Sequence, residues 1–391
     1  MMAVMQQRHS KSLYFGDSWL LIICSLLVVF GLIMMASASI EIADSKYGDA
    51  FYHLKRQLQF LLLGIFAAVG VALIPLKYWR HSAIFLMVCA VALLVMVLLP
   101  GIGKEVNGST RWLNLGFTTV QASEPAKLLI VIFMAYYLSK YREQVCTTWT
   151  GFIMPFVFVA LPIFLLLLEP DFGAVVVLMI AVFGMMFLAG VKLYQFALLS
   201  LLAVAGAAGL VLSAEYRLAR LKSFIAALAD PFSEDVVYGS GYQLAQALIG
   251  FGRGEWFGVG LGNSIQKMYF LPEAHTDFVL AIIAEELGAV SVMILLGLFL
   301  AFILRAMLIA RKNECSGNFF AAYLGYGIAF LFMGQIVINV AVNVGLLPTK
   351  GLTLPFLSSG GSSLIICLVM VAFLIRIDIE NYYLNNKALN N

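Results

Sequence analysis

Charged residues are scarce in this chain. Only 12% of its 391 residues are charged and 62% are hydrophobic, whereas soluble domains contain roughly 25% charged residues. A soluble fold cannot bury so much apolar surface. The apolar residues form long runs bounded by charges, which indicates a polytopic helical membrane protein. They do not alternate with polar residues, which argues against a β-barrel.

Other signatures are missing as well. The five cysteines (Cys24, Cys89, Cys146, Cys315 and Cys367) show no pairing pattern and no metal-ligand spacing. There is no Walker motif, dinucleotide fingerprint or HExxH motif, and no soluble domain long enough for a nucleotide site, which disfavours an ATP-driven or nucleotide-sugar enzyme. A net charge of +3 is too small to indicate nucleic-acid binding. No internal repeat of the kind common in transporters is present.

The hydropathy pattern predicts an all-α protein with ten transmembrane helices and one long extracytoplasmic loop, residues 213–277, between the seventh and eighth helices. Arg8 and Lys11 precede the first helix, which is too long for the apolar core of a signal peptide and is expected to remain uncleaved. The ten predicted spans are 19–39, 58–75, 82–99, 125–139, 152–168, 173–191, 194–212, 278–304, 319–341 and 362–377.

The distribution of Lys and Arg residues predicts the orientation of the chain in the membrane. With the N-terminus inside, twelve of these residues fall in short inside segments and six in short outside loops, which favours cytoplasmic termini and a periplasmic long loop. We therefore expect a single membrane domain over residues 1–391. Its N-terminal segment 1–18 and tail 378–391 would be cytoplasmic.

Asp277 is the most informative candidate residue. It stands with Glu273 and His275 at the outer edge of the eighth predicted span, and ionisable groups there are costly, so they usually have a function. Thr276 or Asp277 could cap the helix that begins near Phe278. A helix N-terminus favours the carboxylate and apolar surroundings disfavour it, so Asp277 could equally be poised as a general base. The residues alone leave both readings open.

A second group precedes and enters the fourth predicted span. Glu124 and Lys127 are three residues apart and can meet on one helix face. They form either a self-neutralising pair or a cation held ready for an anionic head group. Arg111, in the preceding loop, could bind a phosphate through two hydrogen bonds.

Two pairs of acidic residues are expected to have structural roles. Glu285 and Glu286, deeper on the helix that follows Asp277, are expected to form internal salt bridges or hydrogen bonds. Glu169 and Asp171, in a tight outer turn, favour helix capping over a cation site.

The remaining candidates lie in outer loops. Arg217, Arg220 and Lys222 form a basic stripe that either faces anionic membrane lipid or guides a phosphorylated substrate. Lys350 and Ser358 belong to the last outer loop. Its small residues before a helix make either an anion site or an ordinary cap.

Taken together, these motifs resemble the SEDS family (shape, elongation, division and sporulation), and its cell-division branch more than its elongation branch. The resemblance runs in order along nearly the whole chain, through Asn107-Gly108, Arg111-Trp112, Ser123-Glu124 with Lys127, Glu169–Gly173, Gly241-Tyr242-Gln243, Leu271–Phe278, Glu285–Gly288, Thr349–Pro355 and Gly360–Ser363. It departs from the family pattern at Ser359, Ala122 and Ala247.

The resemblance implies a peptidoglycan glycosyltransferase of the bacterial inner membrane, active at the septum. It would polymerise lipid II, a disaccharide-pentapeptide on undecaprenyl pyrophosphate, into β-1,4 glycan at the periplasmic face. Its partners would be a class B penicillin-binding transpeptidase and other divisome membrane proteins. Asp277 matches the family's essential aspartate. Glu124 and Lys127 match a functionally important pair, and Arg111 matches a basic position before it.

This chemistry predicts roles for the candidates. Asp277 would deprotonate the attacking sugar hydroxyl, with Glu273 and His275 tuning or positioning it. Pyrophosphate oxygens would be held by one or more of Arg111, Lys127, Arg217, Arg220 and Lys350. A divalent cation, Mg²⁺ or Mn²⁺, could assist at the pyrophosphate, although no convincing ligand set is visible. The alternatives are a lipid II flippase and a non-catalytic scaffold that recruits the transpeptidase.

Overall fold

The computed structural model describes most of the chain, and the fold below refers to these residues only. The described residues are 14, 16–106, 109–114, 119–212, 218, 222, 224–226, 230, 232–233, 236, 239, 241–348 and 351–389.

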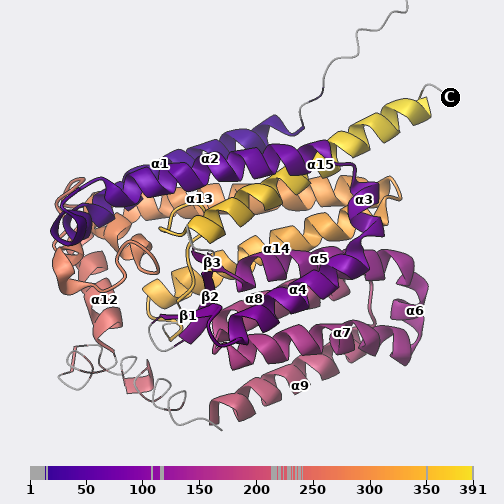
Figure 1. Ribbon diagram of the computed structural model, residues 1–391, viewed down its shortest axis with the longest axis horizontal. Coiled ribbons are helices and arrows are strands. Elements are labelled where there is room, and N and C mark those ends of the chain that lie inside the picture. Colours follow the sequence, from indigo (N-terminus) through magenta and orange to yellow (C-terminus); the bar gives the residue numbers. More distant parts are fainter. Residues whose placement is uncertain are drawn as a thin grey trace, which may run out of the picture.

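Helices make up most of the described chain (Figure 1). The long ones are α1 (Ser18–Tyr47), α2 (Tyr52–Leu73), α4 (Ala83–Leu98), α5 (Ser123–Lys140), α7 (Trp149–Leu168), α8 (Phe172–Leu188), α9 (Leu193–Leu212), α13 (Val279–Cys315), α14 (Phe319–Asn343) and α15 (Gly361–Leu389). Shorter ones are α3 (Leu76–His81), α6 (Arg142–Thr147), α12 (Tyr242–Gly254) and the π-helix η1 (Gln266–Phe270).

Each predicted apolar segment overlaps one of the long helices. Within the described residues, six of these helices are long and apolar enough to cross a membrane, namely α1, α2, α7, α13, α14 and α15. The apolar stretches of α4, α8 and α9 are shorter, and α5 carries the charged residues Glu124, Lys127 and Lys140. The structure therefore shows a multi-span helical membrane protein.

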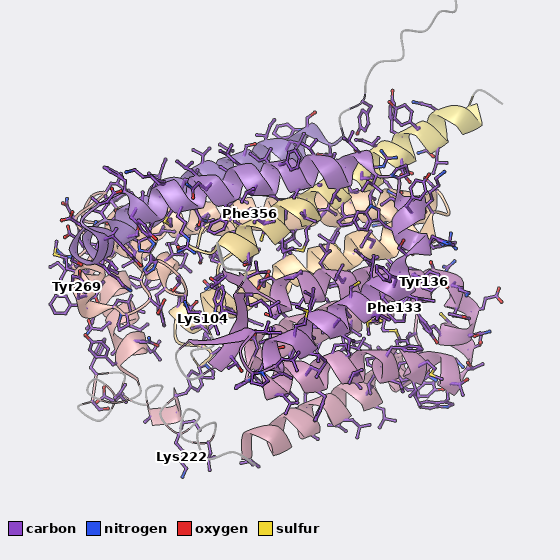
Figure 2. All side chains as sticks on the ribbon, viewed as in Figure 1. Lys104, Phe133, Tyr136, Lys222, Tyr269 and Phe356 are labelled. Carbon is purple, nitrogen blue, oxygen red and sulfur yellow. The ribbon has the colours of Figure 1, made fainter. Side chains whose placement is uncertain are left out.

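The bundle is organised around α14, which packs against α13, α8 and α5, while α15 packs along α2. Most side chains of α14 are buried. Phe302, Phe332 and Phe356 form an aromatic cluster in the core, with ring centroids 4.9 to 5.6 Å apart. Figure 2 places Phe356 within the bundle, Tyr269 and Lys104 toward one end, and Tyr136 toward the other.

A small sheet corrects the all-α prediction. Strands β1 (Gly103–Val106), β2 (Ser109–Asn114) and β3 (Thr119–Gln121) pair antiparallel in the order β1-β2-β3. Trp112 is the central position, opposite Lys104 on one side and Gln121 on the other. Strands of three to six residues are too short for a clear period-2 pattern, which is why the hydropathy pattern missed them.

Helix α13 is interrupted at Gly288, whose φ of 78° and ψ of 177° are not helical. The amides of Ala289 and Val290 lose their helical acceptors and donate instead to the carbonyls of Glu255 and Trp256. In return, the carbonyls of Glu285 and Glu286 accept from the amides of 259 and 260. The loop after α12 thus satisfies the backbone groups that the break exposes.

The beginning and the end of the described chain lie at the same end of the bundle (Figure 1). The hydroxyl of Tyr14 donates to Asp378 Oδ2 over 2.5 Å. The start of α13, and with it Asp277, lies at the opposite end of that long helix.

Candidate functional site

Asp277 lies just before α13, but it does not cap the helix. The N-cap position is Phe278, and it has no side-chain capping bond. Asn343 of α14 takes over this task, because its Oδ1 accepts from the amide of Ala281 over 3.3 Å. Of the two alternatives that the sequence left open for Asp277, helix capping is therefore not the one observed. A neighbouring helix supplies the cap, so the Asp277 carboxylate is not needed for it.

The backbone of Asp277 is held firmly. Its carbonyl accepts from Nδ2 of Asn339 and from Nδ2 of Asn343, both over 3.0 Å. Asn339 also donates to the carbonyl of Leu352 over 2.6 Å. These two asparagines, one helical turn apart on α14, thus join the start of α13 to the loop before α15.

The Asp277 carboxylate faces Arg111 across Gly351. A Cβ atom on Gly351 would lie 3.5 Å from Asp277 Oδ2 and 3.8 Å from Arg111 Nη1. Gly351 has a φ of +69°, a conformation that glycine adopts without strain. The missing side chain leaves open the space between an acid and a cation.

Burial raises the pKa of Asp277 to about 7. The carboxylates of Glu273 and Asp171 act in the same direction, and the guanidinium of Arg111 opposes them. Because its pKa is close to neutrality, Asp277 can exchange a proton near pH 7, which is the property that a general base needs.

Arg111 projects from β2 onto the turn after α7. Its Nη2 donates to the carbonyl of Pro170 over 2.5 Å, and its Nε donates to the carbonyl of Glu169 over 3.3 Å. The sheet that hydropathy missed therefore positions this cation, and the Nη1 edge is directed toward Gly351.

The turn after α7 contains two acidic residues that differ in their hydrogen bonding. Asp171 caps α8 through the amide of Ala174 over 3.1 Å and accepts from Ser123 Oγ over 2.9 Å, so capping is confirmed for Asp171. Glu169 is fully buried, and its carboxylate oxygens have no partner among the described residues. Burial and the charge of Asp171 raise the pKa of Glu169 to about 8, so it is mainly protonated at pH 7.

Ser358 braces the segment around Asp277. Its hydroxyl donates to the carbonyl of Thr276 over 2.5 Å and accepts from the amide of Leu354 over 2.7 Å. The amide of Ser359 donates to the carbonyl of His275 over 2.8 Å. The loop before α15 and the segment before α13 thus form one unit.

Glu273 and His275 flank Asp277 on its N-terminal side. Glu273 is exposed, has a φ of +59°, and accepts from Thr276 Oγ1 over 2.7 Å. Burial lowers the pKa of His275, and its ring lies 5.1 Å from that of His53 on α2. His275 is therefore neutral at pH 7, while Glu273 supplies negative charge beside Asp277.

Glu124 and Lys127 form a buried ion pair on α5, with Nζ 2.9 Å from Oε1. Gln335 of α14 donates to the same oxygen over 3.4 Å. The Lys127 side chain is 3% exposed, so the pair neutralises itself in this conformation. The start of α5 lies beside the turn after α7, because Ser123 Oγ donates a hydrogen bond to Asp171.

Glu285 and Glu286 have internal partners, as predicted. Glu285 pairs with Arg253 over 2.6 Å and Glu286 with Lys267 over 2.8 Å, and both carboxylates are fully buried. Ser37 of α1 donates to Glu286 over 2.7 Å. These contacts tie the end of the long loop to α13 and α1.

Three predicted site residues, Arg217, Arg220 and Lys350, lie outside the described residues. Sequence reasoning also missed Asn339 and Asn343, although two asparagines four residues apart in an apolar helix are a recognisable signal. Within the described part of the chain, no group of three or more His, Cys, Asp or Glu side chains could hold a metal ion.

The chain resembles known proteins over nearly its whole length. The family model described as "Cell cycle protein" (FTSW_RODA_SPOVE) matches residues 17–383. A probable peptidoglycan glycosyltransferase FtsW from Pseudomonas fluorescens is 50% identical over 359 residues, which is 92% of this chain and 86% of the relative. Its namesake from Hahella chejuensis is 51% identical over 354 residues, which is 90% of this chain and 88% of the relative.

Solved structures agree with this relationship. A structure described as the coordination of polymerization and crosslinking by a peptidoglycan synthase complex superposes with a TM-score of 0.76 at 27% identity, covering 94% of this chain and 98% of the other. The rod shape determining protein RodA of Thermus thermophilus gives 0.69 at 25% identity with the same coverage. This chain therefore belongs to the FtsW, RodA and SpoVE family of cell cycle proteins.

Proposed function

We propose that this integral inner-membrane protein polymerises lipid II into β-1,4 glycan strands during septal wall synthesis, with Asp277 as the general base. The class of activity, peptidoglycan glycosyl transfer in cell division, is supported by the shared name of relatives at about half identity. The single observation that supports the base is the Asp277 carboxylate, with a pKa of about 7, facing Arg111 across Gly351.

The reaction requires one proton acceptor and cationic support for a leaving group. Asp277 takes the proton of the acceptor's 4-hydroxyl as that oxygen forms a bond to the anomeric carbon of the donor. The bond from that carbon to the lipid pyrophosphate breaks, and its electron pair leaves with the pyrophosphate. Direct displacement inverts the α-linked donor to a β-linked product. No nucleotide is consumed.

Arg111 is the described cation best placed for the pyrophosphate. Two of its nitrogens are fixed by backbone carbonyls, which orients the guanidinium before substrate arrives. Lys127 would have to leave Glu124 before it could contact an anion. Arg217, Arg220 and Lys350 remain proposed pyrophosphate ligands from the outer loops.

Glu273 and His275 tune the base in this proposal. The negative charge of Glu273 helps to raise the pKa of Asp277 toward neutrality. His275 stays uncharged because it is buried, so it adds no positive charge that would lower that pKa. Ser358 acts as a brace that fixes the carbonyl of Thr276, next to the base.

The membrane arrangement in this proposal has ten spans, cytoplasmic termini and a periplasmic loop between the seventh and eighth spans. A class B penicillin-binding transpeptidase and other divisome proteins are the proposed partners. The similarity to a structure of a peptidoglycan synthase complex supports assembly with a crosslinking enzyme.

Purified protein with its transpeptidase partner and lipid II tests the base. Asp277→Asn should bind lipid II but lose about 10²- to 10⁴-fold in polymerisation rate, the usual contribution of general-base catalysis. Glu41→Gln, which changes an exposed carboxylate of α1, is the matched control and should polymerise normally. Near-normal glycan synthesis by Asp277→Asn would exclude Asp277 as the base.

The same variants separate the rival functions. A flippase would move labelled lipid II across vesicle membranes without making glycan. A scaffold would support growth equally well with Asp277→Asn. A folded Asp277→Asn variant that recruits the transpeptidase but supports neither growth nor polymerisation would favour the enzyme.

A further inference from the structure

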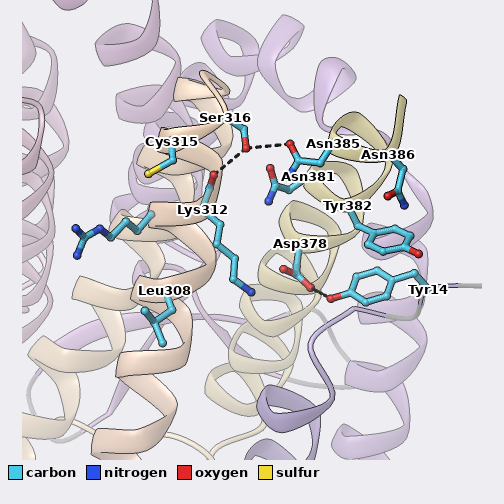
Figure 3. A pocket seen from close by; sticks show the side chains of 11 residues that line it. Tyr14, Leu308, Lys312, Cys315, Ser316, Asp378, Asn381, Tyr382, Asn385 and Asn386 are labelled. Atoms are coloured by element: carbon cyan, nitrogen blue, oxygen red, sulfur yellow. Dashed lines mark hydrogen bonds between the residues drawn. The ribbon is translucent and has the colours of Figure 1, made fainter. Parts of the chain in front are cut away.

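A pocket of about 590 Å³ lies at the far end of α13 from Asp277, between the last turns of α13 and α15 (Figure 3). This volume falls within the range of roughly 300–1,000 Å³ that small-molecule sites occupy. The glycosyl transfer proposed above uses none of the residues that line this pocket.

The two walls of the pocket carry opposite charges. Lys312 of α13 extends into the space between the helices, and Asp378 of α15 faces that space with the hydroxyl of Tyr14 on its Oδ2 (Figure 3). In the part of the chain that the structure describes, neither Lys312 nor Asp378 belongs to an ion pair. Arg311 of α13 also lines the pocket, so the walls offer two cations and one anion to a ligand.

A buried acceptor adds to the acidic wall. Asn381 lines the pocket one helical turn after Asp378 and is 5% exposed, and its Oδ1 has no partner among the described residues. A buried amide oxygen without a hydrogen bond is costly. A ligand that donates N–H bonds at this wall would remove that cost.

Exposed apolar side chains lie on α13 next to the pocket. Leu304 and Leu308, on the turns of α13 before Lys312, are 53% and 46% exposed, which suits contact with acyl chains. Leu308 also lines the pocket. Basic pockets between transmembrane helices on the cytoplasmic side are typical head-group sites, and the topology proposed above puts this pocket on that side.

We propose that this pocket binds the phosphoethanolamine head group of a membrane phospholipid. The phosphate would contact Lys312, and the ammonium would donate to Asp378 and to Oδ1 of Asn381. Asp378 favours this zwitterion over purely anionic head groups, because its carboxylate pairs with the ammonium of the zwitterion and repels a head group that carries only negative charge. Choline is excluded from the same role because its methylated nitrogen has no N–H to donate.

Native mass spectrometry of the full-length protein with defined lipids tests the assignment. Phosphatidylethanolamine should be retained in preference to phosphatidylglycerol and phosphatidylcholine. Lys312→Met and Asp378→Asn should each weaken its retention by about tenfold, the effect of one lost charge-assisted contact. Lys312→Arg should restore it. Lys77→Met, at an exposed lysine of α3, is the matched control and should leave retention unchanged.

Equal retention of the three lipids, or unchanged retention in both pocket variants, would overturn the assignment. Soluble phosphoethanolamine is the remaining comparison. If soluble phosphoethanolamine displaces the lipid at similar concentrations, the pocket binds a free metabolite and the proposal of a membrane lipid is wrong. Asn381→Ala offers a variant that keeps both charges, and it should also weaken retention. Asp277→Asn should retain the lipid normally, which separates this result from the outcome for glycosyl transfer.

Discussion

Replacing Arg111 should move the pH dependence of polymerisation in a known direction. Oδ2 of Asp277 and Nη1 of Arg111 lie 3.5 and 3.8 Å from one point above Gly351, so these atoms are at most about 7 Å apart. At that separation, opposite unit charges attract by roughly 2.4 kcal/mol with an effective dielectric constant of 20, and by roughly 0.6 kcal/mol in water. Asp277 is partly exposed, so we expect a value between these limits, about 1.4 kcal/mol or one pH unit.

The sign follows from the role of the base. Asp277 must be deprotonated to accept a proton, so kcat/KM should fall as the pH falls through about 7. Arg111→Met removes the charge that lowers the pKa of Asp277, so this acidic limb should move up by about one pH unit. Glu273→Gln removes a charge that raises the pKa, so the limb should move down.

The assay is the initial rate of glycan synthesis from lipid II between about pH 5.5 and 9, at lipid concentrations well below KM. Arg111→Lys keeps the charge and loses the forked hydrogen bonds. It should lower the rate but leave the limb in place. If the limb stays fixed in Arg111→Met, or moves the same way in Arg111→Met and Glu273→Gln, the electrostatic account of this site is wrong.

Three further perturbations test the surrounding structure. Glu169→Gln should raise the thermal unfolding temperature more at pH 9 than at pH 6. The pKa of Glu169 is about 8 in the folded protein, above its value in the unfolded chain, so this side chain destabilises the fold increasingly as the pH rises between those two pKa values. An equal gain at both pH values would contradict this. Asn343→Leu should cost about 1–3 kcal/mol by removing a helix cap and a bond to the Asp277 carbonyl, and unfolding in denaturing detergent would measure it. Lys267→Met should cost about 3–5 kcal/mol because it leaves Glu286 buried without its cation; the double variant with Glu286→Gln should recover part of that loss, and additivity of the two changes would argue against coupling.

Much of the bundle could be predicted because hydropathy reports long apolar helices directly. Each predicted segment overlaps a helix, and the internal pairing of Glu285 and Glu286 follows from the cost of burying charge. The strands around Arg111 and the break at Gly288 could not be predicted in this way. Both depend on contacts between segments far apart in sequence, such as the carbonyls of Glu255 and Trp256 with the amides after Gly288.

The candidate site, like the fold, could be predicted only in part. Asp277 stood out because a carboxylate at a span boundary is unusual, and its local sequence equally supported a helix cap. The decision came from Asn343, which lies 62 residues beyond Ala281 and performs the capping. Glu169 was recognised only as part of a turn. Its burial without a partner is a property of packing.

The break in α13 also changes how this helix relates to membrane thickness. The part after Gly288, residues 289–315, has 27 residues and is about 40 Å long at 1.5 Å per residue. That exceeds the hydrocarbon core of roughly 30 Å, so this part can cross the bilayer alone. The part before Gly288, residues 279–287, carries Glu285 and Glu286 and can then lie at the level of the head groups. The ion pairs of Glu285 with Arg253 and of Glu286 with Lys267 would then lie outside the hydrocarbon core. They would fix the end of the long loop at the membrane surface, on the same side as Asp277.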